Sequence, residues 1–358
     1  MKLKKILVGA VAILIIGSFS GCRKSNKSGN VELTNKINSY IESLTKDKKF
    51  SGTVLVARRG EILTEKSIGN SNNELSIANS SNTKYRIGSL TNSFTAAAIL
   101  QIEEKGFLSL DDTVSKYIPS YPKGDKITIS QLINHTSGIV NYTNFEDFNV
   151  VARFNYPLSK IIDSFKSKPL EFAPGSKYKY SDSNYILLGY IIEKITGKKY
   201  ADYLSENILK PLKMDNTGVI QEEVILKNRA NGYKLSADGK LTNIPYQDSS
   251  RLYSSTGMYS TVGDLYLWER ALYGEKIISK KEKDKIFNPE EGKNYCGGWF
   301  FDSNGGHKVV YQDSNILGFS GSIARFIKDD TAIIVLSNTN IEKEELDKIV
   351  SNISVYLF

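Results

Sequence analysis

Ser89 is the first candidate for chemistry, because it stands at the start of a predicted helix that runs from residue 89 to residue 105. The positive end of the helix dipole lies there and favours negative charge that develops on or near the hydroxyl. A serine in such surroundings can act as a nucleophile toward an acyl carbonyl. A serine at a helix start is also a common N-cap, so the position alone leaves both roles open.

Five further segments follow Ser89 and combine polar side chains with glycine or aromatic residues: Leu132–Ile139 with His135, Phe172–Ser176, Tyr180–Tyr185 with Asp182, Gly257–Leu265, and Gly318–Ser322. With the Ser89 segment, they resemble the motifs of the serine β-lactamase and D,D-peptidase (penicillin-binding protein-like) superfamily, in the branch of class C β-lactamases and related esterases. The matches run in family order from about residue 50 to residue 338. Such an ordered set is more specific than any single motif.

The resemblance implies a mechanism in which Ser89 attacks an acyl carbonyl and forms an ester intermediate. A family lysine three residues after the serine, or Tyr180 acting with it, takes the serine proton. The backbone N–H groups of Ser89 and Ser322 are expected to stabilise the oxyanion. The implied substrate pocket comprises Asn92, Asp182, Phe319, Ser320 and Gly321.

Three of these positions depart from the family pattern. Asn92 stands where the family has lysine, Asp182 where it has asparagine, and Phe319 where it has lysine or histidine. An amide cannot accept a proton as an amine does, and loss of positioned proton transfer typically costs about 10²–10⁴ in rate. The added negative charge of Asp182 should raise the pKa of Tyr180. Phe319 would remove a polar contact to a substrate carboxylate, so we expect weak or altered activity.

Two interpretations of function stay open. In the first, the protein is a serine hydrolase that acts through Ser89 on acyl substrates of the cell envelope, D-alanyl or ester-type. One rescue is open to such an enzyme: Asp182 could serve as the general base, directly or through a water, whereas His135 is expected to be structural. In the second, the site is inactive and the protein is a binding or regulatory module for a cell-wall component or a partner protein. A third interpretation, a scaffold whose pocket has no role, is disfavoured because the family motifs are preserved outside the three substituted positions.

The elements around these motifs predict an α+β fold. Strands are expected at residues 53–57, 62–67, 295–301, 309–312, 322–327 and 331–337. Close spacing without crossover helices favours an antiparallel sheet. The resemblance implies a β-lactamase/transpeptidase-like domain over residues 31–358. Its sheet lobe (about 31–85 and 255–358) would be flanked by the terminal helices, and a helical lobe (about 86–254) would be inserted, with Ser89 at the junction.

The N-terminus has the pattern of a secretory signal peptide. Three lysines within the first five residues precede an apolar run over residues 6–16, which has the length of a signal-peptide core. The sequence Ser18–Cys22 resembles the lipobox of bacterial lipoproteins. We expect a signal peptide over residues 1–21, a lipid on Cys22, a polar tether over residues 22–30, and a location on the outer face of the cytoplasmic membrane. An uncleaved membrane anchor is the alternative.

Composition narrows the function classes further. The 358 residues are 40% hydrophobic and 24% charged, which is ordinary for a globular protein. The net charge of +8 includes no basic run with interleaved aromatics, so no nucleic-acid partner is expected. Two His and two Cys leave little for a metal site, and no cofactor is expected. If Cys22 is lipidated, Cys296 is the remaining thiol and is expected to pack in a strand as a small hydrophobic residue.

Overall fold

A seven-stranded antiparallel sheet forms the centre of the molecule. The computed structural model describes residues 22–45, 50–236, 238–289 and 292–358. The strand order is β10-β11-β12-β13-β14-β1-β2. The strands are β1 (Gly52–Arg58), β2 (Glu61–Ile68), β10 (Tyr295–Cys296), β11 (Trp299–Asn304), β12 (His307–Ile316), β13 (Phe319–Phe326) and β14 (Thr331–Ser337). The predicted antiparallel sheet, built from both ends of the chain, is confirmed.

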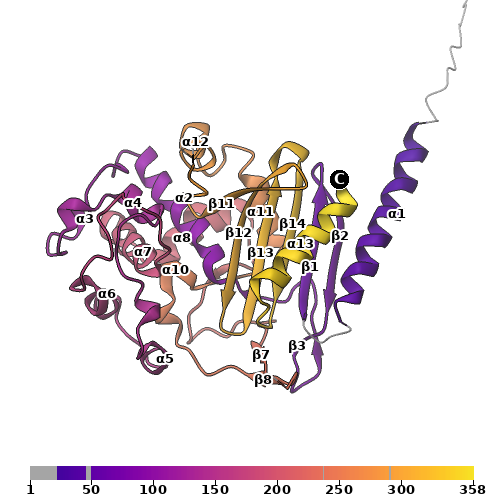
Figure 1. Ribbon diagram of the computed structural model, residues 1–358, viewed down its shortest axis with the longest axis horizontal. Coiled ribbons are helices and arrows are strands. Elements are labelled where there is room, and N and C mark those ends of the chain that lie inside the picture. Colours follow the sequence, from indigo (N-terminus) through magenta and orange to yellow (C-terminus); the bar gives the residue numbers. More distant parts are fainter. Residues whose placement is uncertain (1–21, 46–49, 237, 290–291) are drawn as a thin grey trace, which may run out of the picture.

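Helices cover both faces of this sheet (Figure 1). Side chains alternate between faces along each strand, so Val54 and Val335 face one side and Leu55 and Ile334 the other. The first face is covered by α1 (Cys22–Ser43) and α13 (Lys343–Leu357), the first and last helices of the chain. The second face packs against α11 (Val262–Ala271) and the beginning of the helical lobe. The expected flanking by terminal helices is confirmed.

The helical lobe lies beside the sheet and is built around α7, whose sides are almost entirely buried. Its helices are α2 (Thr91–Glu104), α3 (Val114–Tyr117), α4 (Ile129–Ile133), α5 (Phe148–Val151), α6 (Leu158–Lys166), α7 (Asp182–Thr196), α8 (Tyr200–Leu204), α9 (Lys210–Leu212) and α10 (Tyr253–Thr256). Between this lobe and the C-terminal strands lies α12 (Lys280–Phe287). The short strands are β3 (Asn70–Asn72), β4 (Ile77–Ala78), β5 (Tyr85–Arg86), β6 (Gly218–Val219), β7 (Tyr233–Leu235), β8 (Leu241–Asn243) and β9 (Met258–Ser260). The structure therefore has the expected α+β fold of the β-lactamase/transpeptidase type.

The β12–β13 hairpin differs from the expected strand limits. β12 continues to Ile316 and β13 already begins at Phe319, so only Leu317 and Gly318 form the turn. Gly318 has a φ of 78°, which suits a glycine in a tight hairpin turn. β12 is consequently longer than its apolar pattern indicates. This difference decides which residues border the active site.

The N-terminal segment also differs from expectation. Helix α1 begins at Cys22, so residues 22–30, expected to be a polar tether, are helical. Polar residues such as lysine and asparagine do not prevent helix formation, and the helix continues into residues that pack on the sheet, Ile37 and Ile41. The signal peptide expected over residues 1–21 lies outside the described residues. No helix among the described residues is long and apolar enough to cross a membrane.

Candidate active site

Ser89 lies in a short 3₁₀ turn, Gly88–Leu90, that leads directly into α2. β5 brings the chain to this turn by pairing with β9, and the turn packs against β12 and β13 of the sheet. Gly88 has a φ of 49°, and a side chain at this position would collide with Ser314 on β12. The Ser89 side chain is partly exposed, whereas its chain neighbours Gly88 and Leu90 are buried. The expected position at the junction of sheet and helical lobe is confirmed.

The hydroxyl of Tyr180 connects Ser89 to a carboxylate. Its Oη lies 3.0 Å from Ser89 Oγ and donates to Asp182 Oδ1 at 3.0 Å. Because the single phenolic proton goes to Asp182, Ser89 is the donor in its bond to Tyr180. The three groups thus form a chain in which each hydroxyl points its proton toward the carboxylate. Sequence alone could not show that Asp182 is directed toward Ser89.

Asp182 sits in the first turn of α7, where the helix dipole favours an acidic side chain. Its other carboxylate oxygen accepts hydrogen bonds from Asn141 Nδ2 at 3.3 Å and Thr143 Oγ1 at 3.2 Å. The side chain is only 7% exposed, and this burial raises its pKa despite the hydrogen bonds. A raised pKa makes the ionised carboxylate a better proton acceptor than an ordinary aspartate.

Tyr180 is held in its neutral form. Burial raises the pKa of Tyr180 well above its ordinary value, and the nearby charge of Asp182 raises it further. The direction of the Asp182 effect agrees with the prediction from the sequence. A tyrosinate is therefore not the base at neutral pH. The phenol can instead accept the Ser89 proton while it passes its own proton to Asp182, so that it never carries a full charge.

Asn92 occupies the position of the family lysine, one turn after Ser89 on the fully buried side of α2. Its Nδ2 donates to Tyr180 Oη at 3.2 Å. The amide thus holds the phenol oxygen in place but cannot take a proton. Its Oδ1 is buried and accepts no hydrogen bond from the described residues.

His135 has a structural role, as expected. Its Nδ1 accepts a hydrogen bond from the backbone N–H of Ser181 at 3.2 Å and lies 3.2 Å from Asn184 Nδ2. Its ring packs against that of Tyr180, with centroids 4.4 Å apart. Complete burial lowers the pKa of His135 to about 3, so the ring stays neutral. His135 positions the chain that carries Tyr180 and Asp182.

Two side chains of β12 form hydrogen bonds with the Ser89 backbone. Gln312 Nε2 donates to the Ser89 carbonyl at 3.0 Å, and Ser314 Oγ accepts from the Ser89 backbone N–H at 3.0 Å. The ladder between β11 and β12 ends at Tyr311, so the later residues of β12 form a free edge beside the Ser89 turn. Sequence reasoning missed Gln312 and Ser314, because the polar run after Tyr311 does not look like a strand.

The residues proposed on β13 are accordingly corrected. Ser322 pairs with Asp313 on one side and Val335 on the other, so its N–H points into the sheet and cannot serve an oxyanion. Phe319 is buried against Gly232. The other two β13 residues proposed for the pocket are structural. Ser320 bonds the backbone of Thr339 and Ile341, and Gly321 gives room for Leu336.

The first oxyanion donor is present but engaged. In an acyl transfer, the N–H of the nucleophilic serine stabilises the negative oxygen of the tetrahedral intermediate. Here that N–H already donates to Ser314 Oγ, and Ser314 is only 4% exposed. A substrate oxygen must therefore displace this hydroxyl before it can use the Ser89 N–H.

The comparisons with known proteins identify the family of the chain. The model of the family described as Beta-lactamase matches residues 37–354. The chain belongs to the beta-lactamase family. It is 28% identical to penicillin-binding protein 4* of Bacillus subtilis, over 86% of this chain and 72% of that protein. The structure of an octameric penicillin-binding protein homologue from Pyrococcus abyssi superposes with a TM-score of 0.74 at 30% identity, covering 85% and 73% of the chains. FmtA from Staphylococcus aureus, at 22% identity and a TM-score of 0.77 over 90% and 88%, shares the fold.

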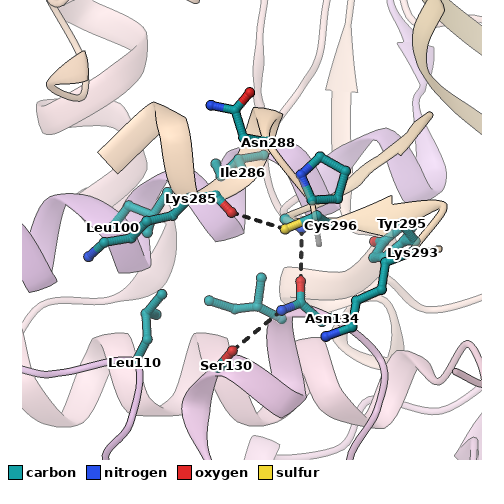
Figure 2. A pocket seen from close by; sticks show the side chains of 13 residues that line it. Leu100, Leu110, Ser130, Asn134, Lys285, Ile286, Asn288, Lys293, Tyr295 and Cys296 are labelled. Atoms are coloured by element: carbon teal, nitrogen blue, oxygen red, sulfur yellow. Dashed lines mark hydrogen bonds between the residues drawn. The ribbon is translucent and has the colours of Figure 1, made fainter. Parts of the chain in front are cut away.

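This beta-lactamase family member also has a cavity of about 270 Å³ that is distinct from the Ser89 site. The cavity lies between α2, α4, α12 and β10 (Figure 2). Cys296 is buried there in β10, as expected, and its Sγ donates to the Lys285 carbonyl. Asn134 accepts the Gly297 N–H at 3.2 Å and so ties the family loop around His135 to β10. Among the described residues, no group of three or more His, Cys, Asp or Glu side chains could hold a metal ion.

Proposed function

We propose that the protein is a serine acyl hydrolase or transferase that acts through Ser89 on acyl substrates of the cell envelope, D-alanyl or ester-type. The observation that carries this proposal is the hydrogen-bonded chain from Ser89 through Tyr180 to Asp182. A site that had lost its chemistry would have no need of a buried carboxylate aligned behind the nucleophile. The family membership supports an acyl-enzyme mechanism, because penicillin-binding relatives are named for such a ligand.

The mechanism follows from the direction of the protons. Ser89 Oγ attacks the substrate carbonyl as its proton moves to Tyr180, and the Tyr180 proton moves to Asp182. The tetrahedral intermediate then collapses, the leaving group takes a proton back along the same chain, and an acyl ester remains on Ser89. Water or another acceptor attacks this ester by the reverse use of the chain. Asn92 keeps the phenol oxygen in line throughout.

Two features should make the activity weak or altered. The neutral Asn92 supplies no positive charge beside Tyr180, so the raised pKa of the phenol works against any charge building up on it. Ser314 competes with the substrate for the Ser89 N–H. Loss of one oxyanion donor costs about 10²–10³ in rate in other enzymes.

The location proposed for this activity is the outer face of the cytoplasmic membrane. The lipobox-like sequence that ends at Cys22 supports lipid anchoring after removal of residues 1–21. The helix that begins at Cys22 would then hold the domain at a distance from the bilayer. The motif resemblance favours the class C and esterase branch of the family.

A second candidate is an inactive binding or regulatory module. The occupied Ser89 N–H favours this alternative, because it leaves the oxyanion position filled in the resting protein. The two candidates differ in whether Ser89 ever becomes acylated.

Release of product from D-alanyl esters and p-nitrophenyl esters tests the proposal. Ser89→Ala should abolish turnover, and Tyr180→Phe should lower it about 10²–10⁴-fold, because the proton path is cut. Tyr178→Phe is the matched control, since Tyr178 is an exposed phenol two residues away and should be neutral. Turnover that is absent, or equal in the wild type and Ser89→Ala, would favour the binding module.

A further inference from the structure

A second hollow, of about 420 Å³, lies close to the nucleophile turn and is not used by the mechanism above. β5 carries Arg86 three residues before Ser89, and the Arg86 side chain lines this hollow. Its polar lining comprises Arg86, Arg229, Asn231, Asn243, Tyr246 and Gln247. Two of these six side chains are cationic and none is acidic.

The guanidinium of Arg86 is buried without adequate partners. Arg86 is only 9% exposed. Its nearest carboxylate is Glu222, with 3.7 Å between Nη2 and Oε1, which is too far for a hydrogen bond. No hydrogen bond to this guanidinium is formed by any residue that the structure describes. A largely buried charge is costly unless hydrogen bonds satisfy it, and the hollow leaves room for a group that could form them.

Arg229 increases the positive character of the same hollow. Its Nη1 lies 3.9 Å from the other oxygen of Glu222, so one carboxylate is shared by two guanidinium groups at more than hydrogen-bond distance. Burial and the neighbouring Arg229 lower the pKa of Arg86, yet an arginine stays charged in proteins. Asp248 is the other nearby acid, and its oxygens accept from Ser250 N–H and Tyr246 Oη.

We propose that this hollow is an anion subsite that binds a carboxylate or phosphate group between Arg86 and Arg229. The planar fork of a guanidinium matches either oxyanion with two parallel hydrogen bonds. Amide side chains of Asn231, Asn243 and Gln247 line the same space and can donate to the remaining oxygens. Glu222 sets the strength of the subsite, because it competes with the ligand for both cations.

The subsite lies within reach of the Ser89 turn. Phe319 lines the hollow and pairs with Ile316 across the β12–β13 hairpin. The Ile316 side chain in turn packs at Gly88, where a Cβ would meet it at 2.8 Å. On the basis of the proposed function, the subsite would hold the anionic end of an acyl substrate whose carbonyl lies at Ser89.

A binding experiment tests the subsite without requiring catalysis. In the Ser89→Ala protein, calorimetric titration with inorganic phosphate and with succinate should show saturable binding. Arg229→Gln should weaken it about 10- to 100-fold, as expected for the loss of a charge-assisted contact, and Glu222→Gln should strengthen it. Arg153→Gln removes the same charge from an exposed position elsewhere and should leave binding unchanged. A tighter complex with phosphate or with succinate tells which group the subsite prefers.

Equal weakening by Arg229→Gln and Arg153→Gln, or no saturation with either anion, would overturn the subsite. Arg86→Lys, which keeps the charge but not the fork, provides a second variant if Arg229→Gln does not fold. In the active protein, an ester with a terminal carboxylate should have a lower KM than its methyl ester, and Arg229→Gln should remove that difference. Anion binding without any turnover would overturn the proposed function and leave the subsite standing. Turnover without anion binding would overturn the subsite and leave the proposed function standing.

Discussion

Removal of the Ser314 hydroxyl should increase the rate at which Ser89 is acylated. In the resting site, Ser314 Oγ accepts the Ser89 N–H at 3.0 Å and occupies the place of a substrate oxyanion. Ser314→Ala deletes this oxygen alone and keeps the Cβ that already fits the strand. The N–H would then be free to donate to the tetrahedral intermediate.

Two limits bound the size of this gain. If the hydroxyl rotates away when substrate binds, the cost is one neutral hydrogen bond, about 0.5–1.5 kcal/mol, or about 2- to 13-fold in rate. If it cannot rotate, the donor is lost and the cost is about 10²–10³. Ser314 is 4% exposed and a Cβ placed on Gly88 would lie 2.1 Å from its Oγ, so little free space surrounds it. We therefore expect a gain toward the upper limit.

The assay is the rate of acyl-enzyme formation with a p-nitrophenyl ester, followed by the first burst of nitrophenol and by intact mass. Ser320→Ala is the control, because Ser320 is a buried serine on the adjacent strand that bonds only backbone away from the site. It should change stability but not the acylation rate. An acylation rate in Ser314→Ala equal to or below that of the wild type would refute the argument that this hydroxyl blocks the oxyanion position.

The remaining predictions concern the other substituted positions and the anchor. The acylation rate should rise with pH through the pKa of Asp182, which burial raises, because only the ionised carboxylate accepts the proton. Asp182→Asn should lower the rate about 10²–10⁴-fold and remove the fall in rate at acidic pH (the acid limb of the profile). Asn92→Lys alone should increase the rate of acylation by a fluorescent penicillin only slightly, because the new amine would pair with Asp182 and stay protonated. Combined with Asp182→Asn, it should increase this rate by more than the two single changes together predict. Cys22→Ser should release the protein from membranes or leave it unprocessed, as measured by fractionation and intact mass.

Each of these predictions has an outcome that contradicts it. An acid limb that survives in Asp182→Asn would show that another group takes the proton. Strict additivity of the Asn92 and Asp182 changes would mean that the two side chains do not act on the same phenol. Unchanged mature mass and membrane association in Cys22→Ser would count against lipidation.

The sheet and the nucleophile were predictable from sequence because their signals are local or ordered along the chain. The strands over residues 53–57 and 331–337 are apolar runs buried on both faces, and their limits agree closely with β1 and β14. Ser89 and Tyr180 were found through spacing within recurrent segments, and the structure brings their oxygens to 3.0 Å. Periodicity and motif order thus carry enough information for the fold and for the two reacting hydroxyls.

The sheet edge beside the nucleophile was not predictable in the same way. Residues 312–316 are largely polar, because one edge of this strand is left unpaired for the site, so hydrophobic periodicity does not mark them as a strand. The pattern Gly318–Ser322 therefore resembles the family motif in the sequence, whereas Gln312 and Ser314 make the hydrogen bonds to Ser89 in the structure. The one available signal was the glycine in the two-residue turn, which places the hairpin at Gly318 and extends β12 to Ile316. The direction of the Asp182 side chain depends on tertiary contacts and lay beyond any sequence pattern.

The most direct test of the account is the site and pH dependence of covalent labelling by a serine-reactive fluorophosphonate. Digestion and mass spectrometry should place the adduct on Ser89, and its rate should rise with pH through the raised pKa of Asp182. Tyr180→Phe should slow labelling strongly, because the hydroxyl that joins Ser89 to Asp182 is gone. Labelling of another residue, or labelling of Ser89 at the same rate in Tyr180→Phe and the wild type, would contradict the claim that this chain of three groups activates the nucleophile.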